Sequence, residues 1–375
     1  MEFRDLKKQY QKLRMQINDA IQAVLDNANF ISGSQVTELE GQLAEYTGRK
    51  HCMACGNGTD ALTLALMALE VGDGDAVFVP DFTFFATGET PAFSGATPVF
   101  VDIEEGTFNI SPSSLEEAII AVKKDGRLVP KAVIAVDLFG QPADYDEIGA
   151  IAKKYGLFLI EDAAQGFGGN IRGKMACSFG DISCTSFFPA KPLGCYGDGG
   201  AVFTDNDEWA ARIRSYQIHG KGENKYDNVR VGINSRLDTL QAAILSVKFQ
   251  AFREYELEAV NHVAERYTEL LGNLVVTPAV KTGYTSSWAQ YSILLQNGEQ
   301  RDELQAYLKQ NGVPSMIYYR KPMHLQKAFQ GMDCTCVALD VTEQVCQRVL
   351  ALPMHPYMEE NEIETVACLI KECIQ

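Results

Sequence analysis

A lysine between two prolines is the clearest candidate for chemistry in this chain. Lys191 lies in the segment SFFPAKPLGCYGDGG, flanked by Pro189 and Pro192 and preceded by Phe187 and Phe188. The prolines prevent a regular helix, and apolar neighbours lower the pKa of a lysine amine because desolvation disfavours its charged form. A neutral amine is the nucleophile needed to form a Schiff base. The alternative is an ordinary solvated surface lysine.

A second segment has the composition of an anion site. In GNGTDA, residues 56–61, the glycines allow a tight turn, and the backbone N–H groups of Thr59 and Asp60 open a helix. Free amides and the helix dipole together favour a phosphate group. Two alternatives stay open: a plain strand-to-helix turn, and a dinucleotide fingerprint, because the segment also fits G-x-G-x-x-A.

Two further segments follow apolar runs. Phe84, in DFTFFAT, could present a ring face to a flat cofactor, with a core aromatic as the alternative. Asp162, in LIEDAAQ, ends an apolar run where a lone carboxylate would be costly to bury. It could serve as the counter-charge of a protonated ring nitrogen, with Gln165 one helical turn further on, or it could be a helix cap.

The four features together match one cofactor. Pyridoxal phosphate requires a phosphate anchor, a ring clamp, a partner for the pyridinium nitrogen and an imine-forming lysine. Nicotinamide requires no such lysine. The combination favours a pyridoxal-phosphate enzyme. The alternatives are an NAD-dependent oxidoreductase, which rests on GNGTDA, and a non-catalytic regulator that binds pyridoxal phosphate.

The elements that must position these groups alternate along the first two thirds of the chain. Helical patterns at 5–27 and 34–47 are followed by strand-like runs at 51–55, 76–80, 97–102, 131–138 and 157–162, with helical segments between them. This alternation indicates βαβ units and a mostly parallel sheet. In such a sheet the loops at the carboxyl ends of the strands form the site.

The pattern changes after residue 200. We expect a long helix from about Arg236 to Leu271, strand-like segments at 288–295 and 314–319, and a final helix at about 359–374. The predicted domains are a cofactor-binding large domain, residues 1–247, and a small C-terminal domain, residues 248–375.

Composition excludes several classes of protein. The 375 residues carry a formal net charge of −16, which argues against binding to nucleic acid or to an anionic membrane surface. We find no apolar run long enough to cross a membrane and no signal peptide, so a cytoplasmic protein with reduced cysteines is expected. His51, Cys52 and Cys55 suggest a metal site, but residues three apart on a strand face opposite ways, and no metal is expected.

The chain resembles the sugar aminotransferases of the DegT/DnrJ/EryC1/StrS family over essentially its whole length. The motifs that carry the resemblance are NGTDAL, FTFFAT, EDAAQ, SFFPAKPLGCYGDGG, GINSRLD and LPMHP. It implies the type I aminotransferase fold, an α/β fold with a mostly parallel seven-stranded central sheet and a smaller C-terminal α+β domain. It also implies a homodimer, in which Asn234 completes the site of the neighbouring subunit.

The resemblance assigns roles to the residues already singled out. Lys191 would form the Schiff base, Asp162 would pair with the pyridine nitrogen, Gln165 would reach the ring oxygen and Phe84 would stack on the ring. The implied phosphate contacts are the backbone at Gly58, Thr59 and Asp60 and the hydroxyl of Ser186.

The motifs look most like the branch that aminates carbon 3 of a UDP-linked N-acetyl-3-keto-hexuronic acid, with glutamate as donor, for surface polysaccharide such as O-antigen. The competing substrate is a UDP- or dTDP-4-keto-6-deoxy sugar. The family pattern is broken at Ser235, where an aromatic is common, and at Arg320, where proline is usual. The candidates for substrate contacts are Arg236, Tyr319, Arg320, His324 and Lys221, with a solvated rim charge as the alternative for Arg320.

Overall fold

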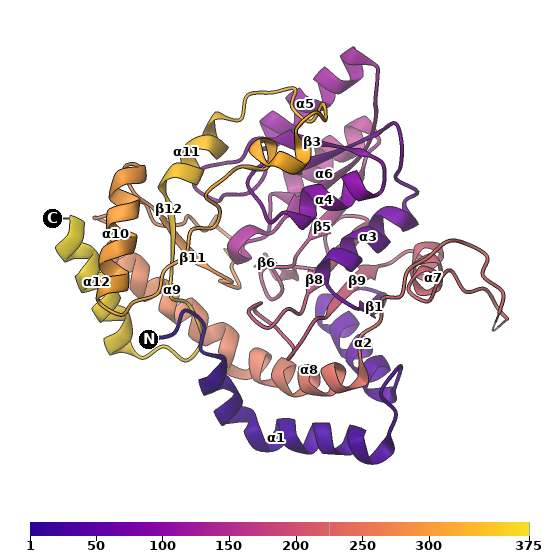
Figure 1. The fold of residues 1–375 in the computed structure, drawn as a ribbon, viewed down its shortest axis with the longest axis horizontal. Coiled ribbons are helices and arrows are strands. Elements are labelled where there is room, and N and C mark those ends of the chain that lie inside the picture. The colour runs from indigo at the N-terminus through magenta and orange to yellow at the C-terminus, as the bar shows by residue number, and fades with distance from the viewer. Residues whose placement is uncertain (225, 375) are drawn as a thin grey trace.

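The computed structural model describes residues 1–224 and 226–374, and its centre is a seven-stranded sheet (Figure 1). In spatial order the strands are β1 (His51–Cys55), β9 (Gly200–Thr204), β8 (Ile182–Ser186), β5 (Phe158–Asp162), β4 (Val129–Val136), β2 (Asp75–Pro80) and β3 (Thr97–Val101). Neighbours from β8 to β3 are parallel, whereas β9 is antiparallel to both β8 and β1. The mostly parallel seven-stranded sheet expected from the sequence is confirmed.

The apolar runs form strands that are buried on both faces. In β2, Val77 and Val79 belong to one core cluster, and Ala76 and Phe78 belong to another. Because successive side chains of a strand point to opposite faces, both faces of this sheet are covered. One face is covered by α3 (Gly58–Ala68), α4 (Ala86–Phe93) and α7 (Asp207–Tyr216), the other by α5 (Pro112–Asp125) and α6 (Tyr145–Tyr155).

Two N-terminal helices and a long helix complete the large part of the molecule. α1 (Leu6–Asn27) and α2 (Ser34–Thr47) pack against α8 (Thr239–Ala251), and a π-helical turn, η2 (Phe252–Glu256), joins α8 to α9 (Leu257–Leu271). The long helix begins three residues later than expected, because residues 233–237 are not helical. In this segment Ser235 and Leu237 are buried, whereas Asn234 and Arg236 are exposed.

The C-terminal part has a core of its own. The antiparallel strands β11 (Tyr291–Leu294) and β12 (Val349–Leu352) pack with α9, α10 (Gly298–Gln310), α11 (Asp340–Arg348) and α12 (Glu360–Ile374). The strand expected at 314–319 is reduced to a single bridge between Met316 and Ala351. The domain division at 247/248 falls within α8 and stays a prediction.

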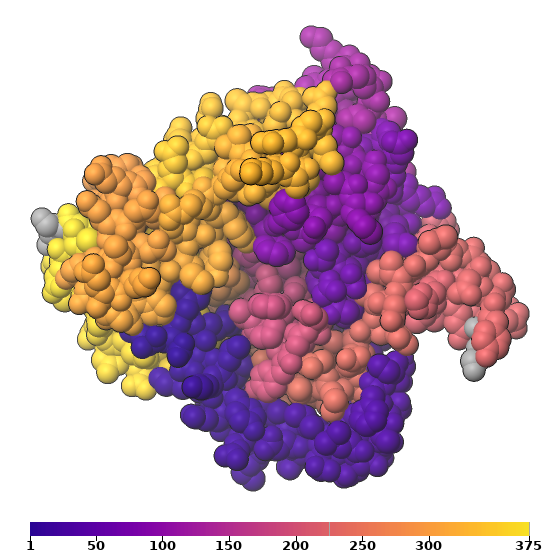
Figure 2. All heavy atoms as spheres, in the orientation of Figure 1, coloured from indigo at the N-terminus to yellow at the C-terminus, as the bar shows by residue number. Residues whose placement is uncertain are grey.

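Short elements connect the two parts. They are β6 (Asn170–Ile171), β7 (Lys174–Met175) and β10 (Tyr284–Thr285), with the 3-10 turns η1 (Leu138–Gly140), η3 (Met323–Leu325) and η4 (Lys327–Phe329). The N-terminus lies beside the C-terminal part (Figures 1 and 2), where the carbonyl of Phe3 accepts a hydrogen bond from Met354 N at 3.1 Å. Among the described residues, no helix is long and apolar enough to span a membrane.

Candidate active site

The predicted site residues follow strands that end at the same edge of the central sheet. Asp162 ends β5 and Ser186 ends β8, and both strands run parallel to β4 and β2. The antiparallel strand β9 begins at this edge, so that Gly200 pairs with Ser186 on one side and with Cys55 on the other. The topology therefore brings the turn after β1 next to the end of β8.

Asp162 is held in one orientation by hydrogen bonds from its own chain. The residue is 5% exposed. Its Oδ2 accepts from Thr87 Oγ1 at 3.0 Å, and its Oδ1 accepts from Ala164 N at 3.2 Å. Thr87 is itself bonded to Thr83, with 3.1 Å between the hydroxyl oxygens. Burial raises the pKa of Asp162, and the contacts with Ala164, Thr87 and Lys191 oppose that rise.

Lys191 lies on a turn whose backbone is bonded on both sides of the lysine. Lys191 N donates to Phe188 O, and Cys195 N donates to Phe187 O, both at 2.8 Å. Burial lowers the pKa of the Lys191 amine to about 8, although Asp162 raises it. The neutral, nucleophilic form of the amine is therefore more populated near neutral pH than in an ordinary lysine.

The turn after β1 forms an anion cradle at the start of α3. The amides of Gly58 and Thr59 have no hydrogen-bond partner within residues 1–224 and 226–374. A Cβ atom on Gly58 would come within 2.7 Å of Ser186 Cβ, so only glycine allows this close approach. The amide of Asp60 is already used, since it donates to Asn57 Oδ1 at 2.8 Å as part of the helix cap.

Ser235 supports this turn from within the same chain. Its Oγ donates to Asp60 Oδ2 at 2.6 Å and accepts from Gly56 N at 2.9 Å. The break in the family pattern at this position thus has a structural account, which the sequence did not reveal. The hydroxyl connects the anion cradle to the segment that precedes α8.

Gln165 connects the site to the C-terminal part. Its Oε1 accepts from Phe139 N at 2.9 Å, and its Nε2 donates to Tyr319 Oη at 3.2 Å. Burial raises the pKa of Tyr319, so this phenol stays protonated. Phe84, between β2 and α4, is 55% exposed and its ring is free to meet a ligand.

Two predicted substrate residues bond to carboxylates. The Arg320 side chain is 57% exposed and bonds to Asp302 at 3.2 Å. His324 Nδ1 lies 2.6 Å from Asp81 Oδ2, and its Nε2 lies 3.3 Å from a Glu343 oxygen. Burial raises the pKa of Asp81 to about 6, while its bonds with His324 act in the opposite direction. His324 thus ties the end of β2 to the C-terminal part.

Asn234 and Arg236 face away from the anion cradle. Both are exposed, and Arg236 Nη2 donates to Asn234 Oδ1 at 2.8 Å. Lys221 lies in the same segment between α7 and α8, where its carbonyl accepts from Ser215 Oγ at 2.7 Å. The structure therefore brings Asp162, the cradle and Lys191 together in one chain, but not Asn234 or Arg236.

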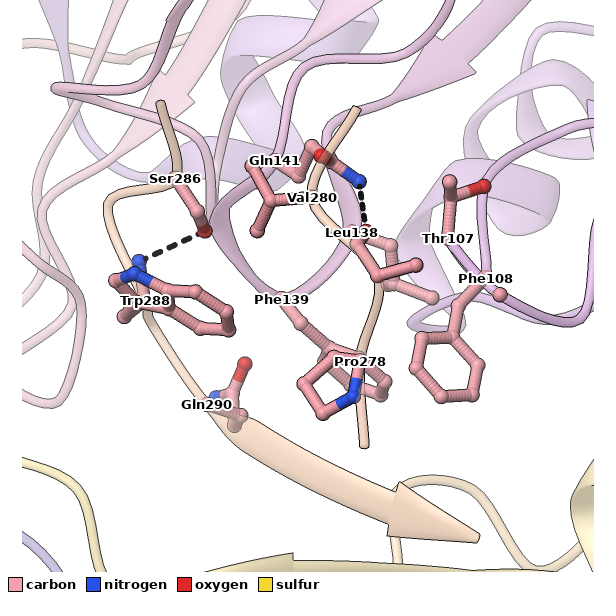
Figure 3. A pocket seen from close by; sticks show the side chains of 12 residues that line it. Thr107, Phe108, Leu138, Phe139, Gln141, Pro278, Val280, Ser286, Trp288 and Gln290 are labelled. Atoms are coloured by element: carbon pink, nitrogen blue, oxygen red, sulfur yellow. Dashed lines mark hydrogen bonds between the residues drawn. The ribbon is translucent and has the colours of Figure 1, made fainter. Parts of the chain in front are cut away.

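A narrow hollow lies where the large part meets the C-terminal part (Figure 3). Phe139 and Pro278 face Trp288 and Gln290 across it, and the volume open to the centre of a water-sized sphere is about 10 Å³. Gln290 Oε1 points into the hollow and has no partner among the residues that the structure describes. An ordered water is the natural partner of such an atom, and none of the predicted site residues lines this hollow.

These groups fit pyridoxal phosphate. Gly58, Thr59 and Ser186 offer two free amides and a hydroxyl to a phosphate, Asp162 offers an oriented carboxylate, and Lys191 offers an amine of lowered pKa. Within the described part of the chain, no group of three or more His, Cys, Asp or Glu side chains could hold a metal ion.

Comparison with known proteins agrees with this chemistry. Residues 11–371 match the model of the DegT/DnrJ/EryC1/StrS aminotransferase family. A Pseudomonas aeruginosa protein named UDP-2-acetamido-2-deoxy-3-oxo-D-glucuronate aminotransferase is 45% identical over 371 residues, covering 99% of each chain. A crystal structure of a family aminotransferase from Brucella abortus has a TM-score of 0.97 and 49% identity, covering 100% of this chain and 99% of that one.

A more distant structure contains the cofactor. NtdA from Bacillus subtilis, solved with bound PMP, the amine form of pyridoxal phosphate, has a TM-score of 0.87 and 30% identity. The match covers 97% of this chain and 82% of that chain.

Proposed function

This chain belongs to the DegT/DnrJ/EryC1/StrS aminotransferase family and is a pyridoxal-phosphate enzyme, and we propose that it aminates carbon 3 of a UDP-linked N-acetyl-3-keto-hexuronic acid. The observation that carries the substrate is the 45% identity, over 99% of the chain, with an aminotransferase named for such a sugar. The proposed donor is L-glutamate. The proposed setting is the cytoplasmic synthesis of sugars for surface polysaccharide such as the O-antigen of lipopolysaccharide.

The proposed chemistry depends on an amine and a carboxylate. When bound, pyridoxal phosphate supplies the carbonyl that takes up the amino group and a ring that accepts electrons. Lys191 holds the cofactor through its amine. With its amine free, Lys191 Nζ would take the proton from the donor α-carbon and later return a proton, as general base and acid. The pKa of about 8 suits both tasks.

Asp162 keeps the ring nitrogen protonated in this proposal. The support is its burial and the bonds from Thr87 and Ala164, which fix the carboxylate at the end of β5. A fixed negative charge stabilises a neighbouring cation far better in a desolvated site than in water. Gln165 would contact the ring oxygen and Phe84 would cover one ring face.

The phosphate would lie at the start of α3. The proposed contacts are Gly58, Thr59, Asp60 and Ser186. The free amides of Gly58 and Thr59 support the first two, whereas Asp60 would have to share its amide with Asn57.

We also propose a homodimer with shared sites. The segment between α7 and α8 projects from the molecule (Figure 2) and leaves Val229 and Val231 55% and 90% exposed. Exposed apolar residues on a projecting segment are typical of an interface with another chain. Asn234 and Arg236 point outward from the same segment, so a second copy of the chain could receive them in its site.

Arg236 is the residue that we favour for binding the carboxylate of the sugar. The substrate carries a carboxylate and two phosphates, and the protein has a net charge of −16, so local cations must offset a repulsive field. An arginine suits a planar carboxylate because it can bind both oxygens. Arg236 has no carboxylate partner among the described residues, whereas Arg320 is paired with Asp302. Tyr319, His324 and Lys221 are further candidates.

The test compares three keto sugars with glutamate as donor. They are the 3-keto uronate, the matched 3-keto sugar with a hydroxymethyl group in place of the carboxylate, and a 4-keto-6-deoxy sugar. We expect the wild type to prefer the uronate. Arg236→Ala should lose on the order of 2–3 kcal/mol, roughly 30- to 150-fold in kcat/KM, on the uronate alone.

Two outcomes would contradict parts of this proposal. A preference of the wild type for the 4-keto-6-deoxy sugar would overturn the substrate but leave the transaminase activity intact. An equal loss of Arg236→Ala on the uronate and the hydroxymethyl sugar would show that Arg236 does not read the carboxylate.

A further inference from the structure

The fourth residue of the chain reaches the turn that carries Lys191. Arg4 Nη2 donates to the carbonyl oxygen of Lys191 at 2.7 Å and to that of Pro192 at 3.4 Å. The two residues are 187 positions apart in the sequence. Both bonds come from one nitrogen, whose N–H bonds lie in the rigid plane of the guanidinium, so they restrict the direction of the backbone between the two carbonyls.

The residues on either side of Arg4 are anchored by other parts of the chain. The carbonyl of Phe3 accepts from Met354 N at 3.1 Å, and the Phe3 ring meets the edge of Tyr318 with 6.2 Å between ring centres. On the other side, Gln9 Nε2 donates to Glu256 Oε1 at 2.9 Å. The N-terminal segment is thus attached on both sides of Arg4.

Arg4 carries a charge that no acidic side chain neutralises directly. It forms no ion pair with the described residues. The groups that face it are Glu256 from η2, Lys248 from α8, and His355 and Tyr357 from the segment before α12. Burial lowers the pKa of Arg4 to about 10, and Glu256 and Tyr357 raise it, so the guanidinium stays charged at neutral pH.

The positive charge of Arg4 lowers the pKa of three neighbouring basic side chains, Lys191, Lys248 and His355. Lys191 faces Asp162 from β5, which raises the pKa of its amine, and Arg4, which lowers it. Lys248 has a pKa lowered to about 8 by burial, and His355 has a pKa lowered to about 4 by burial, with Arg4 contributing to both.

We propose that Arg4 is a positioning residue for the reaction, which holds the backbone of Lys191 from the N-terminal segment and keeps the lysine amine in place beside Asp162. The inference rests on the proposed role of Lys191. Arg4 acts through the lysine turn and touches neither the sugar nor the donor. Its cationic charge also disfavours protonation of the nitrogen that Lys191 contributes.

The test uses the loaded enzyme and two variants of Arg4. The pH dependence of the absorption of the lysine-bound cofactor reports the protonation of the lysine nitrogen without turnover. Arg4→Gln removes the charge, so the midpoint of this absorption titration should rise by about one pH unit. Its kcat should fall about tenfold or more, because a displaced lysine transfers protons poorly. The KM for the keto sugar should stay within about twofold.

Arg4→Lys distinguishes the effect of the positive charge from the effect of the planar guanidinium geometry. The ammonium keeps the positive charge, but its flexible stem and rotatable donors hold the two carbonyls in a less defined geometry. We therefore expect the midpoint to stay within about 0.3 pH units of the wild type and kcat to fall about three- to tenfold. This variant tests the inference even where Arg4→Gln does not fold.

Lys8→Gln is the matched control. Lys8 is on α1 and bonds to Glu359 and to the carbonyl of Tyr357, so its loss removes a charge and an anchor of the same region without touching the lysine turn. Its midpoint and kcat should match the wild type.

Three results would overturn the inference. They are an unchanged midpoint in a folded Arg4→Gln, an unchanged kcat in Arg4→Lys, and a raised KM for the keto sugar with kcat preserved, which would make Arg4 a substrate-binding residue. Persistence of the lysine-bound absorption in Lys191→Ala would instead contradict the proposed role of Lys191, and this outcome is independent of Arg4.

Discussion

Two pairs of polar residues in this chain differ in where their hydrogen-bond partners come from. Asp162 and Gln165 are buried at the end of β5, and their side-chain oxygens are bonded within the chain. Asn234 and Arg236 are exposed, and among the described residues their side chains bond only to each other. Folding alone orders the first group, whereas the second group would acquire its partners only on association with another molecule.

The contrast separates two kinds of failure. A substitution in the buried group, such as one of Asp162, should abolish activity whether or not a second, intact chain is present. A substitution in the exposed group, Asn234 and Arg236, should be compensated when a second chain supplies the intact residue. Four experiments can break or sharpen this distinction, and they are ordered by the size of the expected effect.

Replacing the lysine should have the largest effect. Lys191→Ala should lower turnover by about 10⁴-fold or more, because the substitution removes the amine that forms the Schiff base and moves the proton in this proposal. The protein should still bind the cofactor but lose absorption near about 420 nm. Lys191→Arg should fail as well, because a guanidinium stays protonated. Full activity in either variant would exclude the lysine from the reaction.

Asp162→Asn should rank second. The amide keeps the size of the side chain but removes the charge that stabilises a protonated ring nitrogen, so turnover should fall about 10²- to 10⁴-fold. Circular dichroism and thermal unfolding of the variant serve as the control, since the fold should remain intact. Near-normal rates would show that another group supplies this charge.

Mixing two inactive variants tests the exposed group. Asn234→Ala alone should lose most activity, and combining it with Lys191→Ala should restore about a quarter of the sites when the chains assort randomly. In each hybrid dimer one site combines an intact lysine with an intact asparagine. No recovery, with hybrid dimers demonstrated by mass spectrometry, would rule out a shared site.

Arg320→Ala should have the smallest effect. Its side chain is 57% exposed and paired with Asp302, and exposed pairs of this kind contribute at most about 1 kcal/mol to stability. We expect kcat/KM on the uronate to change by less than about threefold. A loss confined to the uronate and larger than about 30-fold would mean that Arg320 leaves Asp302 to bind the substrate carboxylate.

The fold was largely predictable because the strands are apolar throughout. The expected strands at 51–55, 76–80 and 97–102 match β1, β2 and β3 to within one residue, since only runs buried on both faces have that composition. The segment 314–319 misled the prediction. Its residues form one bridge, between Met316 and Ala351 of β12, whereas Ile317, Tyr318 and Tyr319 pack their side chains against a core cluster without joining the ladder.

Contacts between distant segments were not predictable. Thr87 bonds to Asp162 across 75 positions, and Ser235 bonds to Asp60 across 175. Nothing in the local sequence of Arg4 marks it as a neighbour of Lys191, because the contact exists only once the N-terminal segment lies against the C-terminal part. Residue type and spacing identify groups at strand ends, whereas packing decides which groups support them.

The π-helical turn η2 sets how the buried side of α9 is rotated about the helix axis relative to the buried side of α8. An α-helix rotates about 100° per residue, and a π turn accommodates one extra residue without breaking the helix. Phe249 on α8 therefore faces the core beneath the sheet, while Val263 and Tyr267 on α9 face the C-terminal core. Losing one residue between Ala251 and Leu257 would turn one core against the other by about a quarter of a revolution.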